Sequence, residues 1–132
     1  MLERTLPRAA YFSDEQFGRE RERIFGREWV CVGRDSEVPR AGDTLVVTVA
    51  DESVLLVRGG DGRVRGFYNV CRHRGCQLVL SEGAGHAGTG IRCPYHSWTY
   101  TLEGALKAAP FLEEGDGFTR ADFPLHRVAV DG

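Results

Sequence analysis

Two short segments of the chain combine the side chains that bind transition metals. Cys71 and His73 form a C-x-H pair, Cys93 and His96 form a C-x-x-H pair, and 19 residues separate His73 from Cys93. A site shared by both pairs has two sulfur and two nitrogen ligands, a set that suits either zinc or an iron–sulfur cluster. The spacing therefore predicts a metal site built from two loops.

The order of the ligands favours the cluster. Zinc-finger patterns group ligands by type, with two cysteines followed by two histidines. Here each loop supplies one of each, which suits an Fe₂S₂ core between the loops, with one ligand from each loop on either iron. A Rieske [2Fe–2S] centre needs this set, because two histidines replace two cysteines on one iron. A structural zinc-binding module is the alternative.

The two segments carry a family resemblance. Cys-Arg-His-Arg-Gly at 71–75 and Cys-Pro-Tyr-His-Ser-Trp at 93–98 resemble the Rieske domain of aromatic ring-hydroxylating oxygenase large (alpha) subunits. The flanking runs 66–70 and 99–104 are also similar to that family, and the resemblance extends from about residue 11 to about residue 130. It implies a mainly β fold: a small antiparallel domain that binds the cluster in a two-loop subdomain.

The resemblance also implies roles for the four candidate ligands. Cys71 and Cys93 correspond to the ligands of the inner iron, and His73 and His96 to those of the outer iron, of one [2Fe–2S] cluster per chain. Histidine ligation leaves the cluster less negative than four thiolates would and raises its reduction potential.

Five neighbours are candidates for supporting roles. Arg72 and Arg74 flank the first histidine and are expected to help dock an acidic redox partner or the next subunit. Gly75 is expected to serve loop geometry. Tyr95 and Trp98 are expected to shield the cluster from water. Trp98 also stands where the respiratory Rieske proteins have a serine that donates to the cluster, so we expect a potential on the order of −150 mV.

The implied function is electron relay. In the family, a ferredoxin or flavin reductase supplies single electrons, and the Rieske centre passes them to a mononuclear Fe(II) in an adjacent oxygenase subunit, commonly within a trimer. That Fe(II) activates O₂ for monooxygenase or dioxygenase chemistry such as aromatic ring hydroxylation. A free-standing Rieske ferredoxin is the alternative.

The second metal site is not readable in this chain. A mononuclear oxygenase iron needs two histidines and a carboxylate. After the cluster takes two histidines, His86 and His126 remain, 40 residues apart. We therefore expect no catalytic residue here, a catalytic domain elsewhere in a longer protein, and structural roles for both histidines.

Composition limits the other possibilities. The chain has 132 residues, enough for one domain, and its net charge of −2 argues against a general nucleic-acid binder. No apolar run could span a membrane, and the N-terminus lacks the apolar core of a signal peptide, so a cytoplasmic location is expected. Cys31 is expected to be buried in a strand. In the respiratory Rieske proteins, an additional cysteine from each ligand loop forms a disulfide across the cluster. Comparison with them implies that Cys76 is a free thiol near the cluster, because Tyr95 stands at the position of the second cysteine.

The elements that must position the two loops can be read from local patterns. Residues 1–28 form an N-terminal helical lead, with a helix over 13–25 that Ser13 and Gln16 cap, and residues 29–132 form the Rieske domain, with ligand loops 71–76 and 93–98. Without βαβ alternation, the sheet is expected to be antiparallel. Strands are predicted at 29–34, 43–50, 53–58, 64–70, 98–101, 105–108 and 125–130, with a flexible connection at 81–90 and an irregular segment at 109–123.

Overall fold

The computed structural model describes residues 4–115 and 117–132. Residues 1–3 of the expected lead and Asp116 of the expected irregular segment lie outside this range. The strands are β1 (Asp43–Val49), β2 (Glu52–Arg58), β3 (Val64–Tyr68), β4 (Gly83–His86), β5 (Ile91–Arg92), β6 (Thr99–Tyr100), β7 (Leu106–Ala108) and β8 (Arg127–Val128). The helical segments are α1 (Asp14–Glu20), a π-helical turn (Arg21–Phe25) and 3-10 turns at Arg8–Tyr11, Asp35–Glu37 and Arg120–Asp122.

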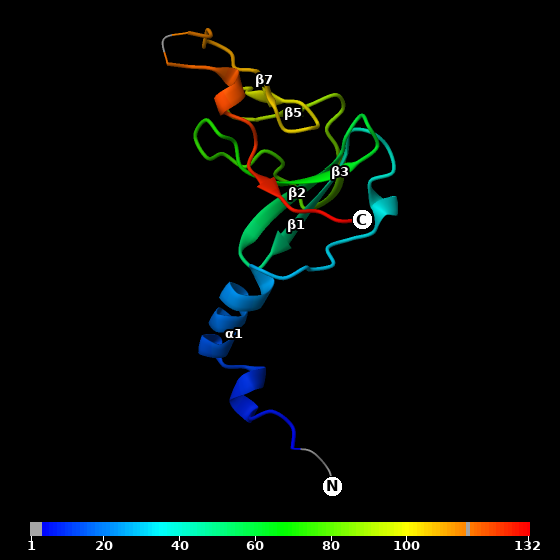
Figure 1. Ribbon diagram of the computed structural model, residues 1–132, viewed down its shortest axis with the longest axis vertical. Helices are drawn as coiled ribbons and strands as arrows, with labels where there is room; N and C mark the ends of the chain where they lie inside the picture. Colours follow the sequence, from blue (N-terminus) through cyan, green and yellow to red (C-terminus); the bar gives the residue numbers. More distant parts are fainter. Residues whose placement is uncertain (1–3, 116) are drawn as a thin grey trace.

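The strands form two antiparallel sheets, as the sequence predicts. The larger sheet has the order β4-β1-β2-β3-β8 and the smaller one the order β5-β6-β7. In the β1–β2 hairpin, Leu45 pairs with Leu56 and Val47 with Val54. Figure 1 shows the smaller sheet, marked by β5 and β7, at one end of the longest axis and α1 at the other.

Strand β2 is buried on both faces, because its apolar residues are consecutive. Leu55 and Val57 point into the main core, which continues through Phe67, Tyr100 and Leu125. The opposite face carries a second, smaller apolar cluster, which consists of Val38, Leu45, Val54 and Leu56. The candidate ligands Cys71 and Cys93 belong to the main core, so the metal site and the fold share the same packed interior.

The N-terminal helix begins where the sequence predicts. Ser13 Oγ accepts a hydrogen bond from the Gln16 backbone N–H at 3.3 Å. The Gln16 side chain donates to Glu20 at 3.0 Å instead of returning to the cap. The α-helix ends at Glu20, and the π-helical turn carries the chain to Phe25, the predicted end. No helix in the described part of the chain is long and apolar enough to cross a membrane.

Two local predictions are wrong. Residues 29–34 pair with no strand among the residues that the structure describes, and Cys31 is exposed. The apolar run Trp29–Val32 reads as a buried strand, but Trp29 is 71% exposed. Conversely, the glycine-rich connection at 81–90 contains β4, which pairs with β1 from Asp43↔His86 to Val46↔Gly83. Glycine disfavours strands by propensity, but here backbone pairing to a neighbouring strand decides the conformation.

Candidate metal centre

The two ligand loops are attached to different sheets, but they have the same pattern of backbone hydrogen bonds. The first loop follows β3, and the second joins β5 to β6. In the first, Cys71 N–H donates to the Cys76 carbonyl at 2.8 Å and Gly75 N–H to the Cys71 carbonyl at 3.0 Å. In the second, Cys93 N–H donates to the Trp98 carbonyl at 2.8 Å and Ser97 N–H to the Cys93 carbonyl at 3.1 Å. Each cysteine therefore begins an equivalent turn.

The fourth residue after each cysteine is left-handed. Gly75 has φ 68° and Ser97 has φ 59°. Glycine adopts this region without strain, which supports the expected geometric role of Gly75. Serine does not, and the Ser97 hydroxyl accepts a hydrogen bond from Arg92 at 2.8 Å.

The thiols of Cys71 and Cys93 lie side by side in the core. Each residue is about 2% exposed. Burial raises the pKa of the Cys71 thiol, and the neighbouring Cys93 thiol raises it further. Burial beside a second thiol therefore disfavours the Cys71 thiolate in the free protein. A cation bound to both sulfurs would reverse that preference, since a coordinating thiol is deprotonated outright.

Tyr100 is a functional residue that sequence reasoning missed. Its buried hydroxyl lies 3.2 Å from Cys71 Sγ and accepts the Arg72 backbone N–H at 3.1 Å. Burial raises the pKa of Tyr100 well above its usual range, so the hydroxyl stays protonated. Because it already accepts from Arg72, its own hydrogen is free to point to Cys71. In the sequence, Tyr100 could have been found from the alternation of strand β6, since Trp98 and Tyr100 are buried and Thr99 between them is less so.

The two imidazoles form a second pair. The rings of His73 and His96 lie 4.9 Å apart between centroids, at 68°. His73 stacks on the Trp98 indole at 4.8 Å and 8°. His96 lies 3.8 Å from the ring of Tyr95. Burial and the neighbouring His96 lower the pKa of His73, so the neutral ring that can bind a metal is favoured.

One ring nitrogen supports the fit of a metal group. His96 Nδ1 is buried and has no hydrogen-bond partner within the described residues. Buried polar atoms are nearly always paired, so such an atom needs an explanation. Ligation by a metal explains it.

The four candidate ligands are grouped by type, thiol beside thiol and imidazole beside imidazole. In residues 4–115 and 117–132, no three His, Cys, Asp or Glu side chains are placed so that they could hold a single ion. Two pairs of unlike ligands are what a two-iron core requires, one pair for each iron.

The predicted neighbours occupy different environments. Arg72 is half-buried: its guanidinium donates to the Pro124 carbonyl at 3.2 Å and lies 5.9 Å from the Phe123 ring centre. Arg74 is exposed. Trp98 is 3% exposed, whereas Tyr95 is 63% exposed. Trp98 thus covers His73 from inside, and Arg74 and Tyr95 face outwards.

His86, His126 and Cys76 lie outside the ligand pairs. His86 Nδ1 lies 2.8 Å from Asp43 Oδ1, which fits the expected structural role. His126 Nδ1 lies 3.5 Å from Arg72. Cys76 is a half-buried free thiol, and burial raises its pKa, with a smaller contribution from Cys93.

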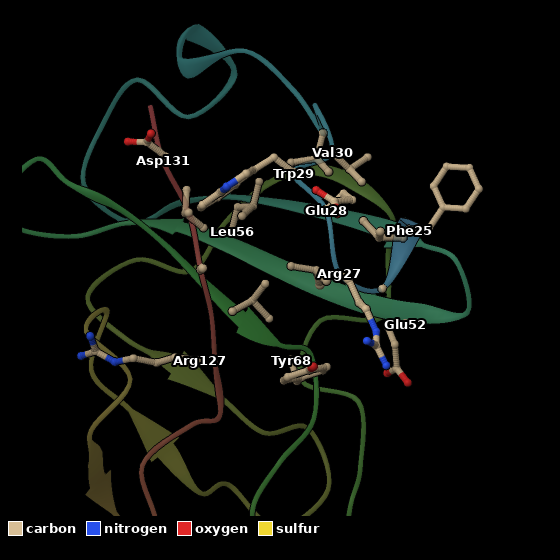
Figure 2. A pocket seen from close by; sticks show the side chains of 17 residues that line it. Phe25, Arg27, Glu28, Trp29, Val30, Glu52, Leu56, Tyr68, Arg127 and Asp131 are labelled. Atoms are coloured by element: carbon tan, nitrogen blue, oxygen red, sulfur yellow. The ribbon is translucent and has the colours of Figure 1, made fainter. Parts of the chain in front are cut away.

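A shallow groove lies away from the ligand loops. It runs between the segment after the π-helical turn and the C-terminal tail, over the β2 residues Val54 and Leu56. Figure 2 shows Trp29, Val30 and Tyr68 around it. None of the four candidate ligands lines this groove.

Comparison with known proteins identifies the family of the chain. The model of the Rieske [2Fe-2S] domain matches residues 28–124. The carnitine monooxygenase oxygenase subunit of Acinetobacter baumannii is 39% identical over 127 residues, which are 96% of this chain and 34% of the relative. The biphenyl 2,3-dioxygenase subunit alpha of Rhodococcus jostii is 38% identical over 92% of this chain and 26% of its own length.

A solved structure gives the same result. The structure of a quaternary ammonium Rieske monooxygenase, from work on carnitine oxidation by gut microbiota and inter-subunit electron transfer, matches with a TM-score of 0.87 and 36% identity. The match covers 96% of this chain and 34% of that one. The chain therefore spans about a quarter to a third of the length of these relatives.

Proposed function

This chain belongs to the Rieske [2Fe-2S] domain family, and on that premise we propose that it is the electron-relay domain of an oxygenase subunit. Its relatives are monooxygenase and dioxygenase subunits. The match to them reaches into the N-terminal lead, before the family domain begins at residue 28. A free-standing ferredoxin would not need that lead, so the oxygenase subunit is favoured.

The proposed ligands are the two pairs described above, Cys71 with Cys93 and His73 with His96. The observation that carries this assignment is the grouping by type, together with the unpartnered Nδ1 of His96. When bound, the cluster supplies a centre that accepts and releases one electron. The chain buries the thiol side in its core and leaves the imidazole side half-exposed.

Electron exchange is proposed to occur at the imidazole side, where Arg74 and Tyr95 are exposed. A positive side chain beside the exchange point would increase the association rate of an acidic donor. Arg72 contributes less to such docking, because Pro124 and Phe123 hold its guanidinium within the chain. The donor is a reductase or ferredoxin, and the acceptor is a mononuclear iron in the rest of a full-length assembly, with an adjacent subunit of a trimer as the proposed location.

The substrate is proposed only as a class. Relatives at 39% and 38% identity act, by their names, on carnitine and on biphenyl. Their shared chemistry is incorporation of O₂ into an organic molecule, with aromatic ring hydroxylation as one form and oxidation of quaternary ammonium compounds as another.

The proposed domain division is 1–28 for the lead and 29–132 for the Rieske domain. A reducing, cytoplasmic location is also proposed, because Cys31 and Cys76, which are not proposed ligands, are free thiols.

The test is spectroscopy of the protein purified without oxygen. The wild type should contain two irons and two sulfides per chain, absorb visible light and give a rhombic EPR signal on reduction. Cys93→Ser should lose the signal, and Cys31→Ser, an exposed cysteine outside the site, should keep it. A colourless, zinc-loaded protein would overturn the proposal. A reading frame that stops after codon 132 would favour the free-standing carrier.

A further inference from the structure

The imidazole of His73, in the first ligand loop, stacks on the indole of Trp98, at the end of the second ligand loop. Its ring lies parallel to the Trp98 indole, with an interplanar angle of 8° and a centroid distance of 4.8 Å. The indole belongs to the main core and is 3% exposed. A buried indole cannot move without repacking the core, so the ring stacked on it has a fixed plane.

Two phenylalanines from a distant part of the chain hold the indole. Phe123 meets Trp98 edge to face at 5.7 Å and 86°, and Phe118 lies 6.0 Å from it at 58°. Phe118 and Phe123 also contact each other, with centroids 5.4 Å apart. Aromatic pairs in such arrangements are worth about 0.5–1.5 kcal/mol beyond their area burial. Both come from the segment that precedes β8, far in sequence from either ligand loop.

The segment 118–124 also contacts the first ligand loop directly, through Arg72. Arg72 lies between the two ligands of that loop. Its guanidinium donates to the Pro124 carbonyl and lies over the Phe123 ring. Phe123 therefore contacts both the residue beside His73 in sequence and the indole stacked on His73.

The second histidine has a different support. His96 contacts the ring of Tyr95 at 3.8 Å and 34°. Tyr95 is 63% exposed, and its ring can move in solvent without repacking the core. The two imidazoles are thus supported unequally, His73 by the core and His96 by a surface side chain.

We propose that Trp98, Phe118 and Phe123 form an aromatic brace that sets the ring plane of His73, with Trp98 as the positioning residue. The proposal rests on the proposed function, in which His73 binds iron. A histidine ligand must present its nitrogen along the bond to the metal, and outer groups that orient ligands contribute strongly to metal affinity. Here stacking supplies that orientation, and the segment 118–124 makes the stacking rigid.

The experiment uses the cluster-containing chain and three variants of the brace. Phe118→Leu and Phe123→Leu each remove one aromatic ring that contacts Trp98. Trp98→Leu removes the ring stacked on His73 and keeps an apolar side chain. Trp98→Phe restores an aromatic face and serves as the conservative rescue. Leu45→Ala, in the cluster on the opposite face of the larger sheet, is the matched control for loss of packing alone.

Two measurements read the outcome, both normalised to the cluster content of each sample. The first is the set of EPR g-values of the reduced cluster, which report the symmetry around the histidine-bound iron. The second is the rate of cluster loss to a chelator. We expect shifted g-values and about 10-fold or faster cluster loss in Trp98→Leu, a smaller change of the same sign in both phenylalanine variants, and recovery in Trp98→Phe.

The outcomes separate the proposal from its premise. Wild-type protein without a cluster spectrum would remove the proposed function and this proposal together. A normal wild-type spectrum with unchanged g-values in the brace variants would overturn the brace alone. So would a control that shifts as much as they do. If Trp98→Leu does not fold, Phe118→Leu and Phe123→Leu decide the question by the same criteria.

Discussion

The two ends of this molecule treat aromatic side chains in opposite ways. At the metal centre, Trp98 and Tyr100 are buried and make specific contacts. In the N-terminal lead, Tyr11, Phe12 and Phe17 are each more than half exposed. An ion pair between Arg21 and Asp51 connects the π-helical turn to the β1–β2 connection. At the metal end, contacts within the chain therefore bury the aromatic side chains. In the lead, the aromatic side chains stay exposed.

The difference shows what an apolar pattern does and does not specify. Both regions are rich in aromatic residues. At the metal end, the partners of these residues come from loops and strands elsewhere in the chain. In the lead, the amphipathic pattern forms a helix but does not bring a core against it. Substitutions of the same type should therefore have unequal effects in the two regions.

The largest contrast is expected from a pair of glycines. Gly104 has φ +89°, and an added Cβ would lie 2.4 Å from Phe67 Cε1 in the core. At Gly18, inside α1, an added Cβ would have no atom within 4 Å apart from its chain neighbours and the backbone of its own helix. Gly104→Ala should destabilise the β domain by about 2–4 kcal/mol, through strain and overpacking. Gly18→Ala should instead favour the helix by about 0.5–1 kcal/mol.

Urea unfolding measures the first effect, and the helical circular dichroism signal measures the second. Equal losses of stability in both variants would contradict the contrast, because they would mean that α1 is packed as closely as the β domain.

A pair of tyrosines gives the next effect. Tyr100→Phe removes the hydroxyl beside Cys71 and leaves the Arg72 N–H without its acceptor. The cost should be about 1–3 kcal/mol of unfolding free energy. A hydrogen bond to a ligand sulfur favours the reduced cluster, so the midpoint potential should fall by up to about 60 mV, or about 1.4 kcal/mol for one electron.

Tyr11→Phe, in the exposed lead, is the control and should change neither quantity. Voltammetry of the cluster-containing chain gives the potentials. An unchanged potential in Tyr100→Phe would show that the hydroxyl does not donate to the sulfur.

The smallest effect concerns a carboxylate of the β domain. Asp43 is buried, and hydrogen bonds from the Arg40 backbone and from His86 lower its pKa below the ordinary 3.8. A carboxyl whose pKa is lower in the folded state stabilises the fold above its unfolded pKa. That contribution is lost as the pH falls through the folded pKa. Asp43→Asn should thus be less stable than the wild type at pH 6–7, and the gap should narrow below about pH 4.

Thermal unfolding of both proteins between pH 3 and pH 7 checks this sign. Parallel curves throughout that range would mean that Asp43 titrates alike in the folded and unfolded chain.

The sequence specified the parts of the fold that depend on local pattern. The β1–β2–β3 meander follows from runs of β-branched residues and a glycine-rich turn, and α1 begins at Ser13 because a serine can cap it. The pairs C-x-H and C-x-x-H located the candidate ligands. The brace could not be predicted in this way, because Phe118 and Phe123 lie in a segment without periodic structure.

The failures have a common physical cause. Trp29–Val32 has strand propensity, but the described part of the chain offers it no strand partner. The glycines of β4 lack propensity, but β1 offers its backbone groups. Trp98 suggested a site without a hydroxyl near the sulfurs, yet Tyr100, two residues later and on the inward face of β6, places its hydroxyl 3.2 Å from Cys71 Sγ. Long-range pairing decided each case, and local sequence does not encode it.

The placement of the ligand loops on separate sheets has a consequence for the newly made protein. A ribosome releases Cys71 and His73 together with β3, and Cys93 emerges 22 residues later. At about 5–20 residues per second, the first two proposed ligands are exposed for about 1–4 s before Cys93 emerges. During translation this half-site offers one thiol and one imidazole to any ion in the cell, so delivery of iron and sulfide belongs after the smaller sheet has emerged.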